Sequence, residues 1–162
     1  MGATLQLVSE EIAIAIVEKD EDTRSAMKSL LSRQPGFTIV ADAADVLAVN
    51  ASAADPDIIL LDDRLRDASD WVNTPGLAEA ARSARVIATG VPVGHSHLVD
   101  LIRVGVAGFV VKDALFAELV STIRAVASGR QKLPTRLVAT LVRNLARTGA
   151  AAALRARRET RR

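Results

Sequence analysis

Five short apolar runs alternate with stretches of helical periodicity, and this alternation constrains the fold of the 162-residue chain more than any other feature. The runs are rich in Val, Ile and Leu with little polar alternation, which is typical of strands covered on both faces. They span residues 12–17, 37–41, 58–61, 85–89 and 107–111. Strands that alternate with helices form a parallel sheet through right-handed crossovers. We therefore predict an α/β fold, a doubly wound five-stranded parallel sheet with helices on both faces.

The intervening segments carry the spacing and the end signals of helices. A polar turn at residues 18–22 precedes a helix to about residue 33, which Pro35-Gly36 terminates. Further helices are predicted over residues 44–54, 75–83, 95–104 and 114–128, and a C-terminal extension helix over 134–147. The remaining arginine-rich tail is predicted to be a linker or a frayed helix. The expected organisation is one domain over residues 10–130, followed by a helix and basic linker over residues 131–162.

Composition excludes several classes of protein and site. The chain has no cysteine, which excludes disulfides, thiol catalysis and a cysteine zinc site. Its apolar runs are far shorter than a spanning helix and no signal peptide is visible, so we expect no membrane partner and a cytoplasmic location. No strand precedes a glycine-rich phosphate loop and no nucleophile–base pair is visible, so an enzyme is not predicted.

Two predicted strands deliver charged side chains to their carboxyl ends. The run at residues 58–61 ends at Asp62, and the run at residues 107–111 ends at Lys112. In an open parallel sheet, ligands bind outside the carboxyl ends of the strands. We therefore expect Asp62 and Lys112 to lie near one another at the same edge of the sheet.

The segment at residues 103–114, RVGVAGFVVKDA, and the shorter segments 126–130, VASGR, and Leu133-Pro134 resemble one family. They are similar to the receiver domains of bacterial two-component response regulators of the NarL/LuxR type, a similarity that covers roughly residues 12–130. The resemblance implies a flavodoxin-like receiver fold in which Asp62 is the phosphoacceptor. It further implies that Lys112 contacts the phosphoryl group and that Phe109 is the switch aromatic.

The same resemblance implies an acidic Mg²⁺ site and a hydroxyl beside the phosphoacceptor, and here the chain departs from the family. The two acidic positions after the first strand fall on Glu18 and Lys19, which leaves Glu18 and Asp62 as metal ligands, with Asp20 one residue later. Mg²⁺ prefers carboxylate and water ligands, so Lys19 is not one. The hydroxyl position falls on Gly90, and the adjacent Thr89 enters the pocket only through a bulge.

Arg64 and Lys19 are two further cations that could neutralise Asp62 without a metal. We therefore expect an atypical receiver in which phosphorylation of Asp62 is impaired or absent and the signal travels through conformation or dimerisation. A conventional Mg²⁺-dependent phosphoacceptor, a ligand-gated pseudo-receiver and a small nucleotide- or flavin-binding α/β module remain open.

The resemblance also implies partners. A sensor histidine kinase is the expected phosphoryl donor, and a homodimer is expected, with a patch formed by Phe116 and Ile123 on the helix over residues 114–128. Residues 143–162 carry seven arginines and one glutamate, whereas residues 1–142 carry 14 basic and 18 acidic side chains. Family members continue from such a linker into a helix-turn-helix domain, and residues 154–159 resemble its beginning. DNA would thus be contacted only through a domain that this chain does not contain.

Overall fold

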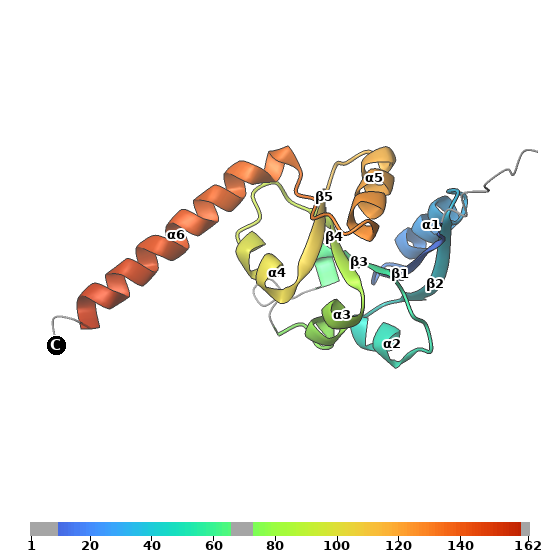
Figure 1. Cartoon of the computed structure of the whole chain (residues 1–162), viewed down its shortest axis with the longest axis horizontal. Coiled ribbons are helices and arrows are strands. Elements are labelled where there is room, and N and C mark those ends of the chain that lie inside the picture. The colour runs from blue at the N-terminus through green and yellow to red at the C-terminus, as the bar shows by residue number, and fades with distance from the viewer. Residues whose placement is uncertain (1–9, 66–72, 160–162) are drawn as a thin grey trace, which may run out of the picture.

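The computed structural model describes residues 10–65 and 73–159 and forms a single parallel sheet with the strand order β2-β1-β3-β4-β5 (Figure 1). The strands are β1 (Ile12–Val17), β2 (Phe37–Ala43), β3 (Ile58–Asp62), β4 (Arg85–Val91) and β5 (Val106–Val111). The helices are α1 (Glu21–Ser32), α2 (Val46–Ala51), α3 (Leu77–Ser83), α4 (Leu98–Val104), α5 (Phe116–Ala127) and α6 (Thr135–Glu159), with a 3-10 turn, η1, at Asp63–Leu65. The predicted flavodoxin-like architecture is confirmed.

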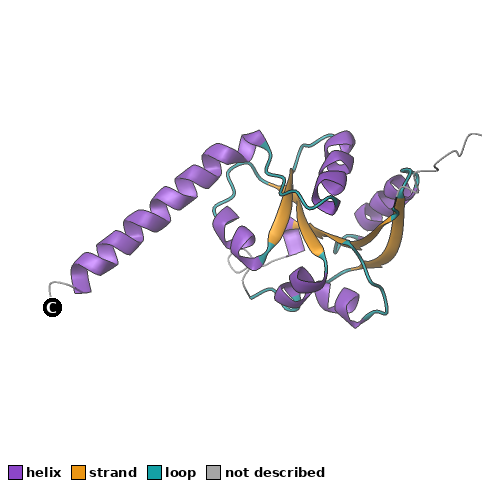
Figure 2. Ribbon diagram, in the orientation of Figure 1, coloured by secondary structure: helices purple, strands orange, loops and turns teal. Residues whose placement is uncertain are grey.

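Helices cover both faces of the sheet, as Figure 2 shows, and side chains alternate between two apolar layers. Ile14 and Ile16 of β1 point into the layer shared with α1 and α5, whereas Ala15 and Val17 point into the layer shared with α2, α3 and α4. All five residues of β3 are buried. Central strands covered on both faces thus account for the continuous apolar runs in the sequence.

Several elements differ in extent from their predicted ranges. Helix α2 is shorter than predicted at both ends: the side chain of Asp45 caps its start by accepting a hydrogen bond from the backbone N–H of Ala48, and Ser52, which has an extended backbone, ends it. Strand β4 continues through Gly90, which adopts a left-handed φ of 68°. Helix α4 begins at Leu98 rather than at residue 95. Most of the polar loop after Asp62 lies outside the described residues.

The largest correction concerns α6, which continues to Glu159 where a linker or frayed helix was expected. Ala and Arg dominate this stretch, and both favour helix strongly. Leu137, Thr140 and Asn144 are the buried residues of α6, and every residue from 145 to 159 is exposed. The C-terminal part of α6 projects away from the domain (Figure 1).

Of the two residues in the predicted dimer patch on α5, Ile123 is not available at the surface and Phe116 is partly exposed. Ile123 is 0% exposed and packs in the layer that α1 and α5 share with the sheet, while Phe116 packs against that layer. A wholly buried residue such as Ile123 cannot also contact a partner. Within the described residues, no helix is both long enough and apolar enough to cross a membrane.

Candidate functional site

Residues from four strand ends meet at the carboxyl edge of the sheet. Glu18 follows β1, Asp62 ends β3, and Val17 pairs with Leu61 in the register that joins these two strands. Asp62 pairs with Thr89 of β4. The backbone N–H of Lys112, just after β5, donates to the carbonyl of Val91 at 3.0 Å. The register of the parallel strands therefore brings together the positions that the sequence selected.

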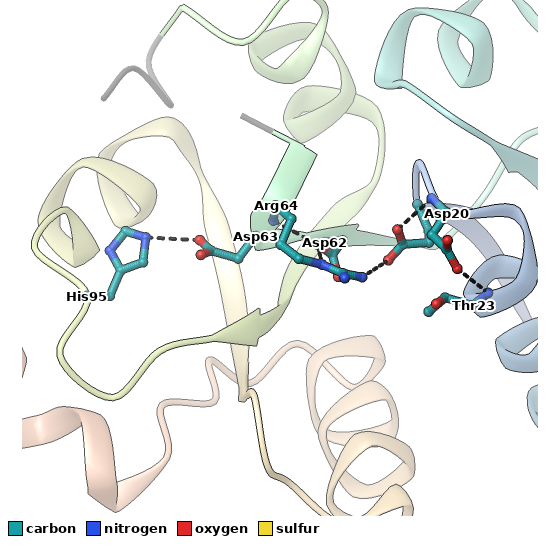
Figure 3. Close-up of polar contacts among 7 residues, drawn as sticks. Asp20, Thr23, Asp62, Asp63, Arg64 and His95 are labelled. Atoms are coloured by element: carbon teal, nitrogen blue, oxygen red, sulfur yellow. Dashed lines mark hydrogen bonds and ion pairs between the residues drawn. The ribbon is translucent and has the colours of Figure 1, made fainter. Parts of the chain in front are cut away.

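The guanidinium group of Arg64 joins the two buried carboxylates of the site. Its Nη2 lies 3.1 Å from Oε2 of Glu18, and its Nε lies 3.0 Å from Oδ1 of Asp62. The backbone N–H of Arg64 donates to the same Oδ1 at 2.7 Å. Figure 3 shows the arginine side chain reaching from η1 across Asp62 toward the end of β1. Arg64 thus supplies the positive charge between the acids.

Burial sets the protonation behaviour of this acid pair. Glu18 is 2% exposed, and its removal from water raises its pKa, with the neighbouring Asp62 carboxylate adding to the increase. The backbone N–H of Asp20 donates to Oε1 of Glu18 at 2.9 Å, and this bond and the charge of Arg64 oppose the increase. The hydrogen bond with Asp62 raises the pKa of Arg64, so this arginine stays charged.

The structure does not bring Lys19, Asp20 or Lys112 into contact with the Asp62 carboxylate. Lys19 is exposed, and the cation beside the acids is Arg64 instead. Asp20 caps α1: its Oδ1 accepts a hydrogen bond from the N–H of Thr23 at 2.7 Å, and bonding to Thr23 lowers its pKa. Lys112 reaches the correct edge of the sheet, but its side chain is exposed.

Gly90 occupies the position at which the receiver domains that this chain resembles carry a hydroxyl. A Cβ placed on Gly90 would lie 3.4 Å from Oδ2 of Asp62, which places position 90 beside this carboxylate. The pairing of β4 with β5 is irregular between Ala88 and Val91, the kind of distortion that bringing Thr89 toward the pocket requires. Thr89 is 8% exposed and lies opposite Asp62 in the sheet.

The side chains that are present do not fit a Mg²⁺ site. Mg²⁺ needs carboxylate oxygens free to coordinate it, and Arg64 already binds Oε2 of Glu18 and Oδ1 of Asp62. Across the described residues, no group of three or more His, Cys, Asp or Glu side chains is arranged to hold a metal ion. In this conformation the arginine occupies the place between the acids that a metal ion would need.

A second polar cluster lies beside the site, and the sequence did not predict it. Oδ1 of Asp63 lies 2.9 Å from Nε2 of His95, whose side chain is 2% exposed (Figure 3). The backbone carbonyl of His95 accepts a hydrogen bond from Nδ2 of Asn144 on α6 at 3.1 Å. The carbonyl of Val93, two residues earlier, accepts one from the hydroxyl of Thr140. The loop between β4 and α4 therefore connects the residue after Asp62 to the C-terminal helix.

Phe109 lines a hollow that β5, α5 and the segment leading into α6 form together. The ring is 3% exposed, and Phe109, Thr122 and Leu133 line the hollow of about 420 Å³ together with other residues of β5, α5 and the start of α6. Neither Asp62 nor Glu18 belongs to its lining. This cavity therefore lends no support to a small molecule held against Asp62.

The chain resembles curated transcription regulators over most of its length. No family model matches it. It is 29% identical over 136 residues to the DNA-binding transcriptional activator DevR/DosR of Mycobacterium tuberculosis, an alignment that covers 83% of this chain and 63% of that protein. It is 27% identical over 153 residues to the nitrate/nitrite response regulator protein NarL of Escherichia coli K12, covering 93% of this chain and 67% of that protein. The chain spans less than two thirds of DevR/DosR.

Solved structures agree with the observed architecture. A two-component response regulator of the LuxR family from Aurantimonas sp. SI85-9A1 superposes with a TM-score of 0.68 at 24% identity, covering 85% of this chain and 99% of that one. The signal receiver domain of the putative response regulator NarL from Mycobacterium tuberculosis gives a TM-score of 0.60 at 23% identity, covering 75% and 99%. At this identity the likeness establishes the fold.

Proposed function

We propose that this chain, a receiver domain of the NarL/LuxR type of response regulator, is an atypical receiver in which Arg64 replaces the metal and phosphorylation of Asp62 is impaired or absent. Its signal is then a change of conformation or of dimerisation rather than an enzymatic reaction. The observation that carries the proposal is the placement of the Arg64 guanidinium against Glu18 and Asp62, at 3.1 and 3.0 Å.

Three features of the pocket act together against phosphoryl transfer. The guanidinium of Arg64 contacts both oxygens of the Asp62 carboxylate, Oδ1 at 3.0 Å and Oδ2 at 3.4 Å, and its charge makes this carboxylate a weaker nucleophile toward a phosphoryl donor. Lys19, which stands at the second acidic position, removes a metal ligand. Gly90 brings no hydroxyl to the side of Asp62. Together these features favour a permanently salt-bridged pocket.

Intact-mass measurement after incubation with acetyl phosphate tests the proposal directly. The whole chain is incubated with and without Mg²⁺, beside an Asp62→Asn control, and its folded state is checked by circular dichroism. We expect no phosphoryl adduct under any condition. A Mg²⁺-dependent adduct that is missing from Asp62→Asn would overturn the proposal and establish a conventional phosphoacceptor.

The wider role follows from the relatives and is part of the proposal. DevR/DosR is a DNA-binding transcriptional activator, and this chain spans 63% of its length. We infer that the domain regulates transcription in the cytoplasm through a DNA-binding domain outside residues 1–162. A sensor histidine kinase would act on it only if Asp62 accepts a phosphoryl group. The expected assembly is a homodimer.

A further inference from the structure

An exposed apolar stripe runs along α6. Val138, Val142 and Leu145 are 44, 59 and 52% exposed, and Gly149 and Ala152 continue the stripe as exposed residues. The spacing alternates between four and three residues, which is the repeat of a coiled-coil seam. The exposed part of α6 lacks the packing against a core that usually stabilises a helix. Isolated helical segments of this length are only marginally stable in water.

The stripe is separate from the face of α6 that docks on the domain and from the arginines. Leu137, Thr140 and Asn144 mark the docked face. At roughly 100° per residue, the centre of this face lies about 125° around the helix from the middle of the stripe. The six arginines of α6 all lie roughly 100° or more from the middle of the stripe. The stripe is therefore uncharged and faces away from the domain.

Nothing in the described part of the chain requires a glycine at position 149. It lies inside α6, its φ is not positive, and a Cβ added to it would meet nothing within 4 Å. Glycine in a helix interior costs about 1 kcal/mol relative to alanine. A residue that destabilises the helix without relieving a contact suggests that something outside the described chain approaches the helix at this position.

We propose that the stripe is a self-association surface that binds a second copy of this chain in antiparallel orientation. In this arrangement the Leu145 side chain lies over the partner's Gly149, and the Val142 side chain lies over the partner's Ala152. Each large residue then meets a small one, which keeps the separation of the two helices even along the seam. The contact is the same on both copies and closes with two-fold symmetry.

Charge selects the antiparallel orientation over the parallel one. Helix α6 carries six arginines and one glutamate, whereas residues 1–134 carry 13 basic and 18 acidic side chains. A parallel pair would place the two basic C-terminal ends together. An antiparallel pair directs each basic end toward the partner's acidic domain, which is favourable by electrostatic complementarity. A membrane surface fits less well, because the stripe is narrow and contains no aromatic residue.

This inference deepens the proposed function by naming the surface through which the homodimer forms. Its test is sedimentation velocity of the full chain over a range of concentrations, with no phosphoryl donor present. Leu145→Glu places a charge in the seam, and Leu154→Glu is the matched control. Leu154 is 57% exposed on the same helix, roughly 180° around from Leu145. Circular dichroism checks the helix content of both variants.

We expect the wild type and Leu154→Glu to be dimers and Leu145→Glu to dissociate with a Kd at least about 100-fold higher. A monomeric wild type at about 100 µM, or equal effects of the two substitutions, would overturn the inference. The sedimentation experiment uses no phosphoryl donor, so a monomeric result would not contradict the proposal that Asp62 is not phosphorylated. A phosphoryl adduct on Asp62 would likewise not contradict association through the stripe on α6.

A size exchange tests the antiparallel pairing itself. Gly149→Leu alone should weaken the dimer, because Leu145 of one copy would meet a leucine of the other. Adding Leu145→Gly restores one large and one small residue at each contact, so the double variant should regain association relative to Gly149→Leu. Leu154→Gly combined with Gly149→Leu is the control for added helix flexibility. If the exchange restores nothing beyond this control, the proposed register is wrong.

Discussion

The Nε2 atom of His95 lies 2.9 Å from the Oδ1 atom of Asp63, and this contact joins the candidate pocket to the loop that holds α6. Nδ1 of His95 accepts a hydrogen bond from the N–H of His97 at 3.0 Å. A ring nitrogen that accepts carries no proton, so Nε2 bears the hydrogen and donates it to Asp63. The imidazole is satisfied on both sides although its side chain is almost wholly buried.

Asp63→Ala is expected to destabilise the fold by about 1–3 kcal/mol, because it leaves the buried Nε2–H of His95 without an acceptor. Asp63→Asn retains an oxygen at the same place and should lose less. Urea unfolding of both variants measures the difference in the free energy of unfolding. Equal and negligible losses would show that the His95 contact contributes nothing to stability.

Asn144→Ala should loosen the attachment of α6 to the domain. The substitution removes the donor to the carbonyl of His95, a contact made by a residue only 4% exposed. A buried carbonyl left unpaired costs about 1–3 kcal/mol. Hydrogen exchange should therefore speed up at residues 92–98 and along the first turns of α6.

Leu154→Ala is the control for the attachment of α6, since its side chain lies on the part of the helix where every residue is exposed. It changes the same helix without touching the β4–α4 loop. Comparable acceleration at residues 92–98 in both variants would mean that exchange there reports on helix stability in general. It would then not report on the Asn144 contact.

The strands, the site positions and helix α6 are predicted from different kinds of sequence signal. These signals differ in how well they predict the structure. Continuous apolar runs locate β1 and β3, and strand register then places Glu18, Asp62 and Gly90 together. The strands need only local pattern, whereas the choice of Glu18 and Gly90 as site positions rests on the resemblance to receiver domains. The switch role of Phe109 and the phosphoryl contact of Lys112 stay predictions.

The contacts that the sequence could not supply all join segments far apart in the chain. The sequence offers Lys19, Arg64 and Lys112 as cations for the pocket of Asp62. Only the path of η1 decides that Arg64, rather than Lys19, meets Glu18. His95 and Asn144 lie 49 residues apart, and no spacing rule pairs them. The one available signal for α6 was its content of strong helix formers, which would have extended the helix past residue 147.

Arg64→Ala should strengthen Mg²⁺ binding. Removal of the guanidinium frees Oε2 of Glu18 and Oδ1 of Asp62 from their side-chain ion pairs, so that both carboxylates can coordinate the metal. Isothermal titration with MgCl₂ compares this variant with the wild type. Arg64→Ala combined with Asp62→Asn is the control, and it should lose the gain. Unchanged Mg²⁺ affinity in Arg64→Ala would mean that the arginine does not exclude the metal.

Glu18→Gln should stabilise the fold increasingly as the pH rises from about 4 toward neutrality. Burial raises the pKa of Glu18 in the folded protein above its value in the unfolded chain, which is about 4.3. A carboxyl whose pKa is raised by folding favours the folded state fully below the unfolded value. That contribution is lost as the pH rises through the folded value.

The amide introduced by Glu18→Gln would keep an oxygen acceptor for the N–H of Asp20 but would not lose a proton. The free energy of unfolding of this variant minus that of the wild type should therefore grow through the same pH window. Urea unfolding at a series of pH values from about 4 to 8 measures it. Glu79→Gln, on the exposed face of α3, controls for the loss of one acidic side chain. A difference that shrinks with rising pH would mean that the attraction of Arg64 outweighs burial at Glu18, and that the salt bridge stabilises the folded pocket.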